Sequence, residues 1–170
     1  SADWKGNTPF PLSANSASEL AKLPRYYVMD LDKGMAESVA PYMPSATEVA
    51  ACRWLTEAEL SVYSSEYGRT GFQGGLQSYR IGRNARLSAE LQLFAGRTID
   101  VPVVFISGKS DWGVHQRAGS LDAMSTRACT QMRGVHLLEG AGHWVQQEQP
   151  EAVSTLLLAF LRQQGHPGRA

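Results

Sequence analysis

The stretch that most constrains the fold is the apolar run from Val101 to Gly108. Its continuous apolar character and its β-branched residues predict a strand buried on both faces, as in a parallel sheet. A helix is predicted from about Ala118 to Cys129, and a second strand from Val135 to Leu138. From about Glu151 to Arg162, apolar residues recur at helical spacing. The order strand, helix, strand, helix predicts a parallel α/β unit.

The chain before this unit has a helical, loop-rich character. Thr56-Glu57-Ala58-Glu59 is a capping box, which predicts a helix that runs to about Tyr67 and is closed by Gly68. We therefore divide the chain into a helical part, residues 1–97, and an α/β part, residues 98–170. Two strands cannot form a parallel sheet that is covered on both faces. Either the fold is unusual or the chain is the C-terminal piece of a larger α/β domain.

Composition narrows the function classes. Lys and Arg together number 16, as do Asp and Glu, and the zero net charge argues against a nucleic-acid binder. No run approaches the roughly 20 apolar residues that a membrane span needs. Cys52 and Cys129 lie far apart and in no metal-binding spacing. This favours free thiols in a reducing compartment, and we expect a cytoplasmic protein.

Two titratable side chains follow the two predicted strands. Asp111 comes just after the first strand, and His143 follows the second strand in the glycine-flanked loop Gly140-Ala141-Gly142-His143-Trp144. Neighbouring parallel strands would place both loops at the same sheet edge, where α/β folds bind ligands. A carboxylate that accepts from Nδ1–H of a histidine orients the ring and stabilises its cation. The alternative is that Asp111 only caps a turn and that His143 is a surface or core histidine.

These motifs resemble those of α/β hydrolases of the epoxide-hydrolase branch. The resemblance extends over about residues 7–163, and its most diagnostic stretch is the tyrosine-bearing segment that begins at Gly71. The segments that carry the resemblance are Asn7-Thr8-Pro9-Phe10, Tyr26-Tyr27 followed by Gly34-Met35-Ala36-Glu37, Gly71-Phe72-Gln73-Gly74-Gly75-Leu76-Gln77-Ser78-Tyr79-Arg80, Gly108-Lys109-Ser110-Asp111 and Gly140-Ala141-Gly142-His143-Trp144. It implies an incomplete α/β-hydrolase fold, in which a helical cap precedes the last β-α-β-α unit of a parallel sheet.

The resemblance also implies a two-step hydrolysis of a small-molecule epoxide to a vicinal diol, without a metal or an organic cofactor. In that family an aspartate opens the epoxide to an alkyl-enzyme ester, while two cap tyrosines hydrogen-bond to the epoxide oxygen. A histidine paired with an acid then activates water. Tyr26 and Tyr79 match the tyrosines, Asp111 the acid and His143 the base, with Tyr27 as an alternative to Tyr26. Trp112 and Trp144 flank the pair and either line the pocket or serve packing.

The family's nucleophile and its oxyanion loop have no match in this chain. Asp3-Trp4 resembles the nucleophile motif, but Lys5 stands where that motif needs a small residue. We therefore expect a fragment that is inactive alone. The alternatives are a non-catalytic remnant that acts as a binding or assembly module, or part of a related dehalogenase or esterase. The unpaired edge of the Val101–Ser107 strand favours association, as a homodimer or a larger assembly.

Overall fold

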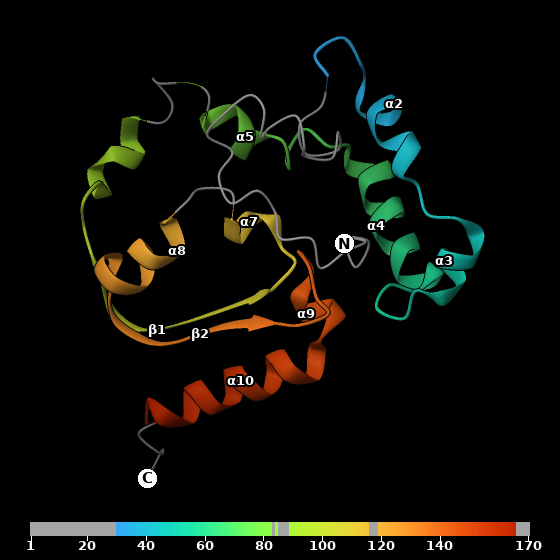
Figure 1. The fold of residues 1–170 in the computed structure, drawn as a ribbon. Coiled ribbons are helices and arrows are strands. Elements are labelled where there is room, and N and C mark those ends of the chain that lie inside the picture. The colour runs from blue at the N-terminus through green and yellow to red at the C-terminus, as the bar shows by residue number, and fades with distance from the viewer. Residues whose placement is uncertain (1–29, 83, 85–88, 116–118, 166–170) are drawn as a thin grey trace. The chain divides into compact units, whose positions relative to one another are not determined.

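The computed structural model describes residues 30–82, 84, 89–115 and 119–165 (Figure 1). The chain divides into two compact units. One unit comprises residues 51–97, and the other comprises residues 1–50 together with 98–170. Tyr26 and Tyr27 lie outside the described residues.

Short helices begin the described part of the chain. Helix α2 spans Met35–Val39, a 3-10 turn η1 spans Ala40–Tyr42, and helix α3 spans Ala46–Ala51. A capping box precedes α3: the backbone N–H of Ser45 donates to the Glu48 carboxylate (2.8 Å), and the backbone N–H of Glu48 donates to the Ser45 hydroxyl (3.3 Å). Serine followed three residues later by glutamate is a sequence signal for a helix start.

The unit of residues 51–97 is built around helix α4, Glu57–Thr70, with helix α5, Gln77–Gly82, and a 3-10 segment η2, Ala89–Phe94. The predicted capping box of α4 is confirmed, since Thr56 and Glu59 each accept the other's backbone N–H. The prediction that Gly68 closes the helix is wrong. The helix continues to Gly71, whose φ of 68° lies in the left-handed region that favours glycine.

The two strands form a parallel pair, as predicted. Strand β1 spans Ile99–Gly108 and strand β2 spans Cys129–Leu138. Strand β2 begins at Cys129 rather than at the predicted Val135, so it starts directly after the helical segment between the strands. That segment consists of α7 (Trp112–His115), α8 (Ser120–Ala123) and a π-helical turn, η3 (Met124–Ala128).

Strand β2 contains a bulge near its middle. Val103 pairs with Met132 and Val104 pairs with Gly134, so Arg133 is an extra residue in β2. Bulges insert one residue into a strand while pairing continues on both sides. Residues 131–134 are therefore part of the strand and not of a loop before it.

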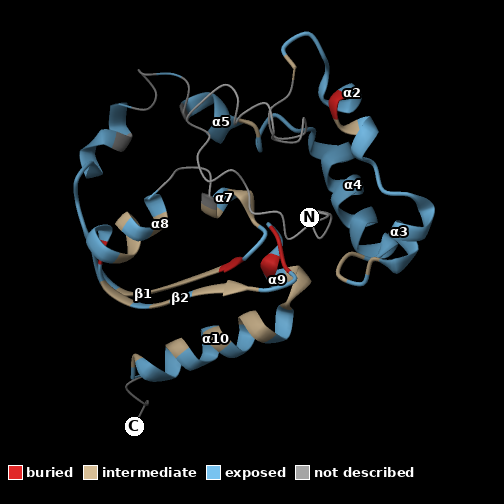
Figure 2. Cartoon of the chain, in the orientation of Figure 1, coloured by how far each residue is buried: buried red, intermediate tan, exposed pale blue. Residues whose placement is uncertain are grey.

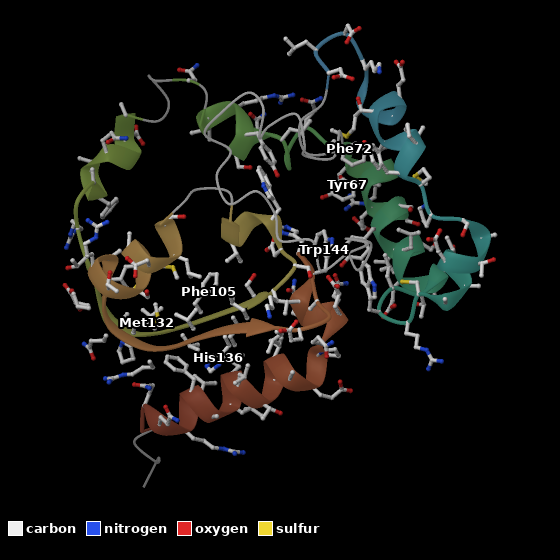
Figure 3. The ribbon with its side chains drawn as sticks, viewed as in Figure 1. Tyr67, Phe72, Phe105, Met132, His136 and Trp144 are labelled. Carbon is white, nitrogen blue, oxygen red and sulfur yellow. The ribbon has the colours of Figure 1, made fainter. Side chains whose placement is uncertain are left out.

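Two helices follow β2: α9, Val145–Glu148, and α10, Pro150–Gln163. Pro150 stands in the first turn of α10, where its missing N–H is harmless. Helix α10 contacts β1 and is drawn along one side of the strand pair (Figure 1). Figure 3 shows His136 on this side and Phe105 and Met132 on the opposite side. The predicted β-α-β-α unit is confirmed.

Burial is slight in this unit. Among the described residues, the buried hydrophobic side chains are Cys129, Ala141 and Val145 (Figure 2). The middle of β1 is half-buried and only its last two residues, Ser107 and Gly108, are buried. The prediction of a strand buried on both faces is therefore wrong for the described structure. Burial is low because, in the described part of the chain, the two strands have no further strands beside them and few helices packed on their faces.

Candidate active site

The site lies where β1 and β2 end. Gly108 and Leu138, the last residues of the two strands, pair with each other, so the loops that follow leave the sheet at the same edge. We call residues 109–111 the acid loop and residues 139–144 the base loop. Parallel pairing places them side by side, as the sequence predicts.

Backbone contacts fasten the two loops together. The N–H of Lys109 donates to the carbonyl of Leu138 (2.8 Å), and the N–H of Ser110 donates to the carbonyl of Ala141 (3.0 Å). The Lys109 ammonium also pairs with the Glu139 carboxylate. Both of these side chains are largely exposed, so this ion pair contributes little to stability. The backbone bonds therefore set the spacing of the loops.

Gly108 permits this close approach. A Cβ atom at this position would overlap the carbonyl groups of Ala141 and Gly142. These are backbone atoms, which cannot move aside as the end of a flexible side chain can. Glycine at the end of β1 thus lets the base loop pass directly over the strand.

The loops bring Asp111 and His143 into contact. Nδ1 of His143 lies 3.3 Å from each carboxylate oxygen of Asp111. The Asp111 side chain is 14% exposed and the His143 side chain 61% exposed. The backbone N–H of Gly113 donates to Oδ1 of Asp111 (2.8 Å), and the Ser107 hydroxyl donates to Oδ2 (3.4 Å). The carboxylate is thus held in place, while the imidazole is open to solvent.

This arrangement suits proton transfer. When Nδ1 of His143 carries the proton, it donates to Asp111 and leaves the Nε2 lone pair for an incoming proton. The carboxylate then stabilises the cation that forms. The pair can therefore serve as a general base with its orienting acid.

A carboxylate that sequence reasoning missed also contacts the base loop. Glu148, the last residue of α9, accepts the backbone N–H groups of Gly142 and Trp144, each at 3.0 Å. These residues lie on either side of His143. The available sequence signal was an acidic residue about one helical turn after the loop.

The remaining predicted site residues are placed as follows. Trp144, which Figure 3 labels, is 44% exposed, and its ring meets the His143 ring edge-on, with centroids 5.3 Å apart and planes at 82°. Trp112 is half-buried and begins α7. Tyr79 lies on α5 in the other unit and is 72% exposed. The structure brings Asp111, His143 and Trp144 together.

Two further observations concern metals and membranes. The described ranges contain no group of three or more His, Cys, Asp or Glu side chains arranged to hold one metal ion. No helix within these ranges combines the length and the apolarity that a bilayer crossing requires.

Relatives of known name were found by sequence. Epoxide hydrolase A of Mycobacterium tuberculosis is 41% identical over 112 residues, which cover 64% of this chain and 32% of that protein. Epoxide hydrolase 1 of Siraitia grosvenorii is 30% identical over 123 residues, which cover 69% of this chain and 38% of that protein. No family model matches. The chain spans about a third of the length of the curated relatives it matches.

Solved structures agree with the sequence relatives. An epoxide hydrolase from an endophytic Streptomyces superimposes with a TM-score of 0.67 and 36% identity, covering 78% of this chain and 37% of that one. An epoxide hydrolase from Vigna radiata gives a TM-score of 0.58 and 31% identity, with coverage of 66% and 37%. The predicted resemblance to epoxide hydrolases is confirmed, and with it the fold class: part of an α/β-hydrolase fold, with helices and a parallel strand pair.

Proposed function

From its kinship with the epoxide hydrolases of the α/β-hydrolase fold, we propose that this chain carries the acid–base pair of such an enzyme and acts in the hydrolytic step. The observation that carries the proposal is the contact between Asp111 and His143 at the ends of β1 and β2. In the proposed reaction, an epoxide has already been opened by an aspartate to an alkyl-enzyme ester. The product is a vicinal diol.

His143 would act on water. Its Nε2 takes a proton as the water oxygen bonds to the ester carbonyl carbon. The bond between the carbonyl carbon and the ester oxygen then breaks, and that oxygen, which stays on the alkyl group, takes the proton back from the imidazolium and leaves as a hydroxyl of the diol. Asp111 keeps Nδ1 protonated and stabilises the imidazolium. General-base assistance of this kind is typically worth about 10² to 10⁴ in rate.

Tyr79 and Tyr26 are proposed as donors to the epoxide oxygen. The O–H group of a phenol can donate a hydrogen bond. The exposure of Tyr79 on α5 is compatible with contact to a ligand. This proposal treats residues 1–97 as linker and helical cap, and residues 98–170 as part of the hydrolase core.

The nucleophile is proposed to lie outside these 170 residues. No aspartate of this sequence stands in a strand-to-helix motif of the expected kind, and the chain spans about a third of its relatives' length. Without a nucleophile no ester forms, so there is nothing for His143 to hydrolyse. The 170-residue chain alone should therefore convert no epoxide to diol.

A chimera tests whether this chain supplies the acid–base pair while the nucleophile comes from outside it. This chain would replace the homologous segment of the Mycobacterium tuberculosis epoxide hydrolase A, and diol formation and covalent adduct would both be measured. We expect the chimera to form diol and the chain alone to form neither. In the chimera, His143→Ala should accumulate the ester, seen by mass spectrometry, while diol formation falls by about 10² or more. Diol formed by the chain alone and lost on His143→Ala would overturn the proposal.

A further inference from the structure

The base loop is held from the side of α9 as well as from the acid loop. Oε2 of Glu148 accepts the N–H of Gly142, and Oε1 accepts the N–H of Trp144, both at 3.0 Å. One carboxylate therefore binds the backbone immediately before and immediately after His143. Hydrogen bonds to an ionised acceptor are about twice as strong as neutral ones.

Glu148 is itself fixed to the structure. Its backbone N–H donates to the carbonyl of Trp144 (2.9 Å), which closes a helical turn within α9. Val145, the first residue of that helix, is 8% exposed and anchors it. The side-chain amide of the next residue, Gln149, donates to the carbonyl of Glu139 at the start of the base loop (3.4 Å). Both side chains reach back from the helix to the loop.

The hydrogen bond from the N–H of Gly142 to Glu148 matters because this N–H is buried. Gly142 and its neighbour Ala141 are buried, and a buried N–H without a hydrogen bond is costly. On the other side of the loop, the carbonyl of Ala141 is already bound by the acid loop. Removing Glu148 would therefore free the two amides beside His143 and leave the bonds to the acid loop in place.

We infer that Glu148 is a positioning residue for His143. Its carboxylate binds the base loop through backbone N–H groups. By fixing the backbone on both sides of His143, it sets the direction in which the imidazole leaves the loop, and hence the Nδ1 contact with Asp111. Its consequence for catalysis rests on the proposed function, whereas its effect on the loop does not.

Hydrogen exchange in the 170-residue chain tests the effect on the loop. We expect the amides of Gly142 and Trp144 to exchange faster in Glu148→Ala than in the unaltered chain. Glu148→Gln should lie between them, because it retains one acceptor oxygen but turns an amide donor toward the other N–H. Glu151→Ala, an exposed glutamate in the first turn of α10, is the matched control and should change neither amide.

Single-turnover kinetics in the chimera described above test the effect on catalysis. A positioning role predicts that Glu148→Ala slows hydrolysis of the ester by about 10- to 100-fold while ester formation is unchanged. Glu148→Gln should recover part of the rate. A general loss of folding would slow both steps together, so this division between the steps is the discriminating readout.

The outcomes separate the two proposals. Unchanged exchange in both Glu148 variants, or unchanged ester hydrolysis in a chimera that depends on His143, overturns the inference and leaves the proposed function standing. Faster exchange in the Glu148→Ala chain, together with a chimera that forms no ester and no diol, overturns the proposed function and leaves the loop-positioning role standing. Equal loss of both chemical steps in Glu148→Ala and Glu148→Gln also overturns the positioning role.

Discussion

At the scale of the residue, position 108 has no room for a side chain, so it must be glycine. A Cβ at this position would overlap the carbonyls of Ala141 and Gly142, so alanine must push the base loop away from β1. Overpacking of this kind typically destabilises a protein by about 1–3 kcal/mol. We expect Gly108→Ala to lower the free energy of unfolding by that order and to separate His143 from Asp111. Denaturant unfolding and hydrogen exchange in the base loop measure the two effects.

Gly68→Ala is the control for this substitution. Gly68 lies within α4, has no atom within 4 Å of an added Cβ and has no left-handed φ. Alanine is favoured over glycine in a helix interior, so this variant should be neutral or slightly stabilising. A Gly108→Ala protein as stable as the Gly68→Ala protein, with its base loop equally protected, would contradict the steric argument.

At the scale of the element, the start of α4 depends on the reciprocal cap between Thr56 and Glu59. The Thr56 side chain accepts the N–H of Glu59, and substitution of such a cap by alanine typically costs about 1 kcal/mol. We expect Thr56→Ala to increase hydrogen exchange in the first turns of α4. Ser65→Ala, at an exposed position inside the same helix, is the matched control and should not weaken it. Equal protection in both variants would show that the cap contributes nothing.

The same cap should respond to pH. The pKa of Glu59 is lowered, first by the hydrogen bond from the backbone N–H of Thr56 and second by that from its hydroxyl. A carboxyl whose pKa is lower in the folded state stabilises that state near neutrality, and the contribution is lost as pH falls through the folded pKa. Exchange in the first turn of α4, corrected for its intrinsic pH dependence, should therefore increase on acidification. Glu59→Gln should remove this pH dependence, and a pH response that persists in that variant would assign it to another group.

At the scale of the whole molecule, the described sheet is only a pair of strands with an unpaired edge on each side. Val101 in β1 is a large apolar residue that is 62% exposed. Exposed strand edges invite pairing with another chain, so we expect the isolated chain to associate as its concentration rises. Light scattering measures the degree of association, and Val101→Lys should reduce that association. Leu31→Lys, at a more exposed apolar position outside the strands, should not reduce association. A compact monomer at all concentrations would contradict the prediction.

The sequence predictions were more accurate for features set by neighbouring residues than for features set by contacts between distant segments. The Thr56–Glu59 cap and the helix from about Glu151 to Arg162 follow from local patterns, and both are present as predicted. The early start of β2 was missed, because Cys129 to Gly134 do not have the continuous apolar character of a buried strand. They form a strand because β1 supplies the partner groups for their backbone. Helix α4 ends at Gly71 rather than at Gly68, because it is at Gly71 that the backbone φ becomes positive.

The sequence by itself determined the parallel β-α-β-α order, the resemblance to epoxide hydrolases and the placing of Asp111 and His143 after neighbouring strands, because these depend on hydrophobic pattern and motif spacing. Only the tertiary structure decided that the Asp111 carboxylate and the His143 ring meet at 3.3 Å, that Gly108 must lack a side chain, and that Glu148 holds the backbone on both sides of the histidine. These contacts join separate segments of the chain. Their geometry depends on how the strands pair and how the loops pack, which no local pattern specifies.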